Sequence, residues 1–167
     1  MYIIIPAYEP DIRLIQVVQD ITIKLPTARI IVVNDGSGPD YGDYYDETAL
    51  FGATVLSHPV NKGKGAALKT AFAYIQEEVV SQHLSAQPIV TVDSDGQHLI
   101  KDIVRVAKAT ENNPSHLILG ARAFVGKVPA RSRIGNKVTA GLFHLVTGQK
   151  VTDTQTGLRG MSTDLIP

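Results

Sequence analysis

Short apolar runs alternate with helix-period segments along most of the chain, and this alternation limits the fold more than any other feature. Each run is continuously apolar, as expected of strands that are covered on both faces. The runs are residues 2–5, 30–33, 53–56, 89–92 and 117–120. Strands that alternate with helices imply βαβ units, in which neighbouring strands run parallel. The sequence therefore predicts an α/β fold with a mostly parallel central sheet.

The segments between these runs carry apolar residues at every third or fourth position, which is typical of helices with one buried face. The four stripes are Leu14, Ile15, Val18, Ile21 and Leu25; Leu68, Phe72, Ile75 and Val79; Ile100, Ile103, Val104 and Ala107; and Ile134, Val138, Leu142 and Leu145. Residues 34–47 and 121–131 lack such a stripe and are rich in Gly, Pro and charge. We therefore expect both stretches to be loops.

Length and composition limit the class of protein. The 167 residues, of which 44% are hydrophobic, suffice for a single domain spanning 1–167 with its own core. Lys and Arg number 16, as do Asp and Glu, and this balance argues against a general nucleic-acid surface, so no nucleic-acid partner is expected. The absence of cysteine excludes disulfides and thiolate metal sites and fits a reducing compartment.

The two ends of the chain suggest where the protein works. Met1 leads directly into an apolar run that stops at Pro6, which is not the pattern of a secretory signal peptide. No apolar run approaches the length of a membrane span, so we expect a cytoplasmic domain. The chain stops abruptly at 164-DLIP-167, and we expect it to be cut short at its C-terminus.

Polar clusters follow three of the predicted strands. They are 6-PAYEP-10, 34-NDGS-37 and 93-DSDGQH-98. In open parallel sheets, ligands bind beyond the carboxyl ends of the strands. The pattern therefore predicts a binding site at this edge of the sheet.

Asp93 and Asp95 are the most informative pair in these clusters. At the end of a strand, residues two apart point the same way, so their carboxylates should repel each other and raise one pKa. A divalent cation such as Mg²⁺ or Mn²⁺ relieves this repulsion and takes oxygen ligands. Gly96 would allow a sharp turn or a close ligand, and Gln97 or His98 could complete the shell.

Other interpretations of this pair exist. A solvated Asp-rich turn is one, since Asp, Ser and Gly favour turns. An EF-hand loop fails because its Gly occupies the sixth position, whereas Gly96 follows the second aspartate directly. A phosphatase-like Asp-x-Asp-Gly-Thr motif would make Asp93 a nucleophile, but Gln97 stands where Thr belongs.

Two further segments suit anionic or nucleoside ligands. Residues 63-GKGAAL-68 follow a strand and open a helix, and Gly-rich backbone with Lys62 and Lys64 suits an anion there, although Leu68 breaks the dinucleotide fingerprint. Asp35 could accept hydrogen bonds from a nucleobase or a ribose hydroxyl. A plain helix start and a plain turn remain the alternatives.

Positive charge gathers in the later part of the chain. Its members are Arg122, Lys127, Arg131 and Arg133. Arginine suits bidentate phosphate recognition, and a solvated basic loop is the alternative. Residues 152–160 are polar enough to line a site before a strand, whereas His58 is expected to be structural.

The order of these motifs resembles family 2 glycosyltransferases of the GT-A fold, most closely the dolichyl- or polyprenyl-phosphate sugar transferases of cell-envelope synthesis. The motifs are IIIPAYEP (3–10), IIVVNDGS (30–37), HPVNKGKGAAL (58–68), VDSDGQH (92–98), LGAR (119–122) and DTQTGLRG (153–160). The resemblance implies a Rossmann-like, three-layer α/β/α sandwich. It also implies a nucleotide-sugar donor linked to UDP or GDP.

The resemblance assigns donor and metal roles residue by residue. Pro6, Ala7, Tyr8, Glu9 and Asp35 would hold the nucleoside, with Lys64 near base and ribose. Asp93, Ser94 and Asp95 would meet the diphosphate. Asp93 and Asp95 would bind Mg²⁺ or Mn²⁺, with Gln97 joining the shell. Arg122 would lie near the phosphates.

The acceptor side follows from the same resemblance. Ser132 and Arg133 would contact an acceptor phosphate, while Asp153, Gln155 and Arg159 would lie beneath sugar and acceptor. Asp95, Asp153 and Arg122 would be the catalytic residues of an inverting displacement. The implied acceptor is a lipid phosphate, which places the full-length protein at the cytoplasmic face of a membrane, reached through a C-terminal part beyond residue 167.

Two other functions compete with this one. A sugar nucleotidyltransferase also pairs an α/β sheet with an acidic metal site, but it carries a Gly-rich basic loop after its first strand, which PAYEP lacks. A non-catalytic nucleotide-sugar-binding module is the other, because a shortened chain could bind donor and metal without transferring the sugar.

Overall fold

The computed structural model describes residues 1–120 and 156–166. Its strands are β1 Tyr2–Ala7, β2 Arg29–Asn34, β3 Thr54–Ser57, β4 Pro88–Thr91, β5 Ile118–Leu119 and β6 Arg159–Ser162. Its helices are α1 Ile12–Lys24, α2 Gly42–Leu50, α3 Lys64–Ser81 and α4 Ile100–Asn112, with 3₁₀ turns η1 Pro39–Tyr41 and η2 Thr163–Leu165. The five predicted strands and the first three predicted helices are all present.

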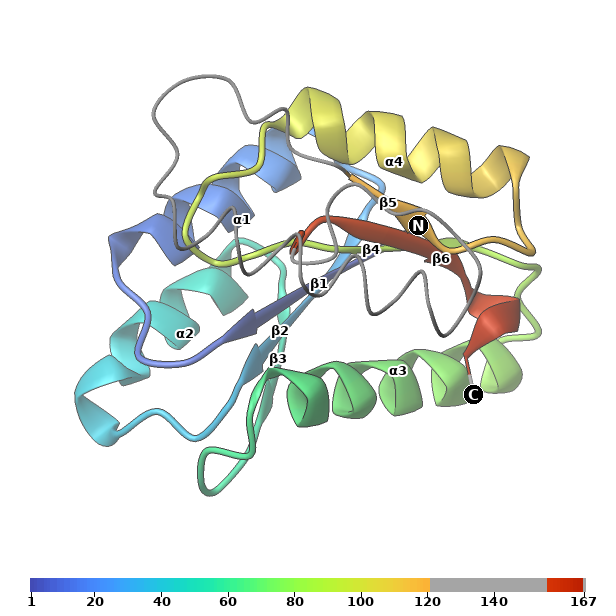
Figure 1. Ribbon diagram of the computed structural model, residues 1–167. Helices are drawn as coiled ribbons and strands as arrows, with labels where there is room; N and C mark the ends of the chain where they lie inside the picture. The colour runs from blue at the N-terminus through green and yellow to red at the C-terminus, as the bar shows by residue number, and fades with distance from the viewer. Residues whose placement is uncertain (121–155, 167) are drawn as a thin grey trace, which may run out of the picture.

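The strands form one six-stranded sheet in the order β3-β2-β1-β4-β6-β5 (Figure 1). The first four strands in this order are parallel, and β6 runs antiparallel between β4 and β5. The mostly parallel sheet predicted from the sequence is therefore confirmed. Because β1, β2 and β4 are adjacent and parallel, their carboxyl ends meet at one edge.

Helices cover both faces of the sheet and make three layers. Helices α1, α2 and α4 lie on one face, and α3 lies on the other (Figure 1). Ile3 and Ile5 of β1 pack toward the first group, whereas Ile4 packs toward α3. Successive side chains of a strand point to opposite faces, so a continuously apolar strand serves two cores at once. This is the three-layer α/β/α arrangement expected from the sequence.

The helical stripes differ in how well they mark the buried face. In α1 the buried residues are those of the predicted stripe except Leu25, which is only partly buried and follows the helix as its C-cap. Asp11 caps the helix by accepting a hydrogen bond from the Arg13 backbone N–H at 3.0 Å. In α3 the fully buried positions are Ala67, Ala71 and Ile75. Small alanine side chains let α3 approach the sheet closely, so the larger Leu68 and Phe72 lie at its flank, partly buried.

The prediction of a loop over residues 34–47 was wrong for its second half, where α2 begins. This helix is short and mostly polar, and only Tyr45 and Thr48 are buried. Two buried positions make too little periodic pattern to reveal a helix. The fourth predicted stripe, 134–145, and the predicted loop 121–131 lie outside the described residues. Within residues 1–120 and 156–166, no helix has the length and apolar character needed to cross a bilayer.

Candidate functional site

A pocket of about 280 Å³ lies at the carboxyl ends of β1, β2 and β4. Its walls come from four separate segments of the chain. They are Pro6 and Ala7 at the end of β1 with Tyr8 directly after it, Asp35 after β2, Lys64 at the start of α3, and Asp93, Ser94 and Asp95 after β4. The parallel register brings these segments together, because each strand delivers its following residues to the same edge.

Asp93 is the most strongly held carboxylate of the pocket. It forms an ion pair with the Lys64 ammonium, and its Oδ2 lies 3.2 Å from His98 Nε2. The hydrogen bond with His98, followed by the contact with Lys64, keeps the pKa of Asp93 well below its usual value, although partial burial acts in the opposite direction. The rise in pKa expected from repulsion between Asp93 and Asp95 is therefore wrong for Asp93, because nearby cationic and donor groups outweigh it.

Asp95 shares the pocket through a tight turn. Gly96 has a φ of +75°, and Asp95 Oδ1 accepts the backbone N–H of Gln97 at 3.1 Å. The left-handed conformation at Gly96 suits a residue without Cβ. The turn folds the chain back on itself, so both carboxylates line one pocket.

These two carboxylates suit a hard divalent cation. Mg²⁺ is commonly held by one or two carboxylates together with phosphate oxygens of a substrate and water. Within residues 1–120 and 156–166, no group of three or more His, Asp or Glu side chains is arranged to hold a metal. Any cation here would therefore depend on ligands from outside this set, which is how a metal–diphosphate complex binds.

Asp35 forms the buried part of the pocket wall. Its Oδ1 accepts hydrogen bonds from His58 Nδ1 at 2.7 Å and from the Lys62 backbone N–H at 3.0 Å. Burial acts to raise the pKa of Asp35, but these hydrogen bonds, with a further one from the Gly63 backbone, lower it below its ordinary value. Asp35 is therefore a charged acceptor at neutral pH.

A hydrogen-bonded network fixes the β1 side of the pocket. Glu9 has a φ of +46°, an unusual conformation for a residue with a side chain. Its backbone N–H donates to Ser37 Oγ at 2.9 Å, and Ser37 Oγ lies 2.8 Å from the hydroxyl of Tyr45. That hydroxyl donates to the Ala7 carbonyl at 3.2 Å. The network ties the ends of β1 and β2 to α2.

The segment before β6 packs directly against Asp93. A Cβ added to Gly157 would lie 1.8 Å from Asp93 Oδ2, so only glycine fits beside the carboxylate. The carbonyl of Gly157 accepts a hydrogen bond from Thr91 Oγ1 at 2.8 Å. Arg159 is partly buried, and its Nε donates to the Thr156 carbonyl at 3.0 Å. This segment therefore forms a wall of the site.

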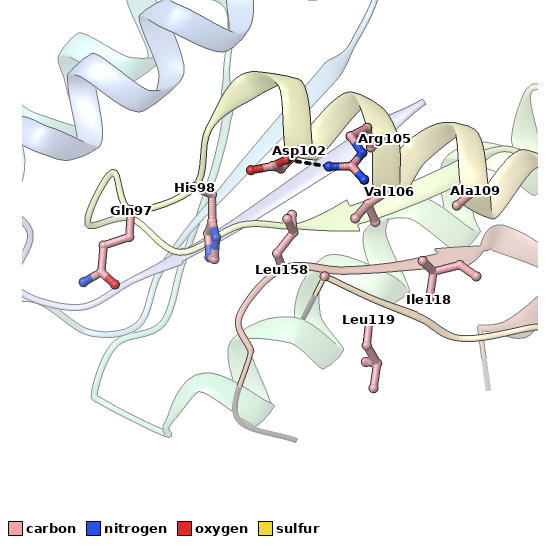
Figure 2. A pocket seen from close by; sticks show the side chains of 10 residues that line it. Gln97, His98, Asp102, Arg105, Val106, Ala109, Ile118, Leu119 and Leu158 are labelled. Atoms are coloured by element: carbon pink, nitrogen blue, oxygen red, sulfur yellow. Dashed lines mark hydrogen bonds and ion pairs between the residues drawn. The ribbon is translucent and has the colours of Figure 1, made fainter. Parts of the chain in front are cut away.

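Figure 2 shows the lining of a second, larger pocket, which has a volume of about 690 Å³. Figure 2 shows Gln97 and His98 at one end and Ala109 and Ile118 at the other. Along α4, Asp102 pairs with Arg105 at 3.4 Å. The rest of the lining is largely apolar and comes from Val106, Leu119 and Leu158. His98 contacts Asp93 and also lines this pocket, so the two pockets adjoin at that side chain.

The sequence matches Glycosyl transferase family 2 over residues 2–166. The chain belongs to this family. Among curated relatives of the family 2 chain is the UDP-N-acetylglucosamine–dolichyl-phosphate N-acetylglucosaminyltransferase of Methanococcus voltae, 29% identical over 180 residues, covering 97% of this chain and 69% of that protein. The family resemblance seen in the motif order is thereby confirmed.

Two of the solved structures that share the fold of this chain are glycosyl-phosphoglycerate synthases. Mannosyl-3-phosphoglycerate synthase from Rubrobacter xylanophilus matches with a TM-score of 0.71 and 16% identity, over 98% of this chain and 54% of that one. Glucosyl-3-phosphoglycerate synthase from Mycobacterium tuberculosis, in complex with Mg²⁺ and UDP, matches with a TM-score of 0.64 and 19% identity, over 98% and 56%. The chain spans little more than half of these proteins. The GT-A fold expected from the sequence is confirmed.

The pocket gathers most of the expected donor residues of the family 2 chain. Of those that lie within the described residues, all except Glu9 line it. Glu9 is exposed beside it, and Gln97 lines the neighbouring pocket instead. Arg159 lies in β6. The remaining expected residues, Arg122, Ser132, Arg133, Asp153 and Gln155, lie outside the described residues.

Sequence reasoning missed three contributors to the site. Ser37 belongs to the quoted NDGS motif, which was the available signal for it. Gly157 lies in the quoted DTQTGLRG motif, but nothing local shows that it touches Asp93. Tyr45 lies in the stretch 34–47 that was expected to be a loop, but it belongs to α2, and its hydroxyl donates to the Ala7 carbonyl at the end of β1.

Proposed function

We propose that this family 2 chain transfers a sugar from a UDP- or GDP-linked donor to polyprenyl or dolichyl phosphate. The observation that carries the proposal is one pocket that combines the paired carboxylates of Asp93 and Asp95 with Lys64 and the buried anion of Asp35. A nucleotide diphosphate with a divalent cation needs this combination of charges. The name of the Methanococcus voltae relative specifies a UDP-linked sugar and dolichyl phosphate, which supports the proposal.

The donor would lie across the pocket from nucleoside to sugar. Asp35 would accept hydrogen bonds from the base or ribose, next to the segment Pro6–Ala7–Tyr8 and Glu9. Lys64 would move onto the diphosphate. Asp93 and Asp95 would hold Mg²⁺ or Mn²⁺, and the family pattern would add Gln97, which lines the neighbouring pocket, to its shell. When bound, the cation would offset the negative charge that builds on the departing diphosphate.

The reaction would be an inverting displacement at the anomeric carbon. An oxygen of the acceptor phosphate forms the new bond to that carbon while the bond to the nucleoside diphosphate breaks. A phosphate monoester has its second pKa near ~6, so this acceptor is already an anion at neutral pH and needs no strong base. Asp93 does not serve as a base, since its depressed pKa leaves it a poor proton acceptor.

The residues outside the described ranges keep the roles implied by the family. Arg122 would assist the leaving diphosphate, and Asp153 would be the base if the acceptor were a hydroxyl. Ser132, Arg133 and Gln155 would face the acceptor, together with Arg159 of β6, which lies within the described residues. A lipid acceptor would place the reaction at the cytoplasmic face of a membrane.

A donor-binding module without transfer is the second candidate. The chain spans 69% of the Methanococcus voltae relative and about half of the solved relatives, so donor binding and sugar transfer are tested separately. Calorimetry with UDP- and GDP-sugars, with and without Mn²⁺, detects the donor site. A transfer assay with polyprenyl phosphate then separates enzyme from module.

The test of the metal site uses Asp93→Asn and Asp95→Asn. Each change removes a charge that would hold the cation, whose contribution to the displacement is several kcal/mol, so Mn²⁺-dependent turnover should fall by about 100-fold or more. Asp102→Asn is the matched control, because Asp102 lies in α4 and pairs with Arg105. Near-normal turnover in both site variants would reject the assignment.

A further inference from the structure

His58 bridges the buried wall of the donor pocket to α3. Its ring is 7% exposed, and its Nδ1 lies 2.7 Å from Asp35 Oδ1. Its Nε2 lies 2.8 Å from Thr70 Oγ1. Both ring nitrogens therefore have partners, one at the end of β2 and one on α3.

The chemistry of the partners sets the state of the ring. The pKa of Asp35 lies below its ordinary value, so its carboxylate is charged and only accepts hydrogen bonds. Nδ1 must then carry the hydrogen that it donates to Asp35. In the neutral ring, Nε2 is left as an acceptor for the hydroxyl of Thr70. Thr70 thus stabilises the tautomer that Asp35 requires.

The same contacts fix the direction of the carboxylate. Asp35 Oδ1 is held by His58 and by the backbone N–H of Lys62, and this oxygen belongs to a side chain that is only 4% exposed. The carboxylate cannot rotate about its Cβ–Cγ bond without losing both hydrogen bonds. A fixed, charged acceptor at the pocket wall distinguishes ligands by where they carry N–H or O–H donors.

We propose that His58 is a positioning residue that orients Asp35 to recognise the nucleoside of the donor. The recognised chemistry is an N–H group of a base or a hydroxyl of ribose, rather than the phosphates. The inference rests on the proposed function, since it assumes that a nucleotide occupies the pocket. It adds a role to a histidine whose sequence context indicated structure alone.

The experiment compares nucleotide with pyrophosphate. Calorimetry measures the binding of UDP, GDP and inorganic pyrophosphate in the presence of Mn²⁺ to the full chain and its variants. In His58→Gln the amide reaches toward Thr70, and Asp35 loses the hydrogen bond from position 58 while it keeps those from the backbone. The tighter-binding nucleotide should then lose about tenfold in affinity, the effect of a hydrogen bond to a charged group, while pyrophosphate stays within about twofold.

Two variants separate positioning from general structure. In His58→Asn the amide nitrogen stands where Nδ1 stands, so the nucleotide affinity should return to within about threefold of the parent. His116→Gln is the matched control, because His116 lies on the exposed turn that follows α4 and contacts Ser115. If His58→Gln does not fold, Thr70→Val replaces it, with an expected loss of about threefold from the unsupported tautomer.

Distinct outcomes overturn distinct claims. Unchanged nucleotide affinity in His58→Gln rejects the role of His58. Equal losses for nucleotide and pyrophosphate also reject it, since they indicate a general effect on the pocket. A further tenfold loss when His58→Gln is added to Asp35→Asn shows that His58 does not act through Asp35. If the parent chain binds neither UDP nor GDP, the proposed function itself fails.

Discussion

The carboxylate of Asp93 makes both charged and polar contacts at this site. Lys64 and His98 contact its two oxygens, and Gly157 leaves room for it. In the structure the ammonium of Lys64 already balances part of the carboxylate's charge. A divalent cation would compete with that ammonium for the same oxygen, so the metal affinity of the free protein depends on Lys64.

The substitution Lys64→Met should change metal binding and nucleotide binding in opposite directions. Without nucleotide, Mn²⁺ should bind about twofold to fivefold more tightly, because a half-exposed ion pair contributes on the order of 0.2–1 kcal/mol and its loss frees the carboxylate. With Mn²⁺ present, UDP should bind more weakly, since a cation for the diphosphate is lost. Electron paramagnetic resonance of free Mn²⁺ measures the first effect. Lys69→Met, elsewhere on α3, is the control. Weaker Mn²⁺ binding to Lys64→Met in the absence of nucleotide would contradict the competition between Lys64 and the cation.

Gly157→Ala tests the packing of the segment before β6 against Asp93. The added Cβ would overlap the carboxylate, which must move away from its present position. A displaced ligand group should weaken Mn²⁺–UDP binding by at least about tenfold in calorimetry. In Gly42→Ala the added Cβ meets nothing within 4 Å, so this variant should bind normally. Equal binding in the two variants would show that the position of Asp93 does not matter.

The site residues differ in whether their positions could be predicted from the sequence. Asp35, Lys64, Asp93 and Asp95 each follow a strand or open a helix within a motif, so their convergence at one sheet edge could be predicted. The contact between Gly157 and Asp93 could not, because it joins positions 64 apart through a strand that inserts next to β4. The tautomer of His58 likewise depends on partners from two other elements.

At the scale of elements, the loops after β2 and β3 pack backbone against backbone. Gly36 has a φ of +76°, and a Cβ there would lie 2.1 Å from the Val60 carbonyl carbon. The loop after β3 leads into α3 and supplies the Lys62 N–H that holds Asp35. The close approach at Gly36 therefore sets the position of two walls of the donor pocket.

Gly36→Ala should be strongly destabilising. The left-handed backbone and the overlap with Val60 act together, and the free energy of unfolding should fall by about 2–4 kcal/mol in urea titrations. Gly38→Ala is the matched control, since Gly38 has a φ of −64° and open space around it. We expect a change within about 0.5 kcal/mol there. Similar losses in both variants would exclude the packing explanation.

The helices and strands could be predicted from the sequence where their buried residues recur at a regular spacing. Helices α1 and α4 show this pattern, and the continuously apolar strands reveal the doubly covered sheet. Helix α2 was not predicted because Tyr45 and Thr48 are its only buried residues. The direction of β6 was also beyond reach, because four residues with alternating burial indicate a strand but not its partner.

At the scale of the whole molecule, the described helices cover the two faces of the sheet unequally. Within residues 1–120 and 156–166, helices α1, α2 and α4 share one face, whereas α3 with η2 covers the other. Ile75 of α3 is fully buried against this second face. The stability of that core therefore depends largely on one helix.

Ile75→Ala should reveal this dependence. Removing a fully buried isoleucine side chain should lower the free energy of unfolding by about 2–5 kcal/mol. Val80→Ala, on the same helix but 67% exposed, should change it by less than about 0.5 kcal/mol. Chemical denaturation of both variants provides the measurement, and a small effect of Ile75→Ala would show that α3 contributes little to the core.

The insertion of β6 between β4 and β5 has a consequence for how the chain is made. A ribosome releases β1 to β4 first, and these strands can pair with one another as they emerge. Strand β5 pairs only with β6 among the described strands, so it must wait for residues 159–162. Until those residues leave the exit tunnel, the flank of β4 stays unpaired and Asp93 lacks the wall that Gly157 provides. The wall of the donor pocket beside Asp93 is thus completed only after residues 159–162 have emerged.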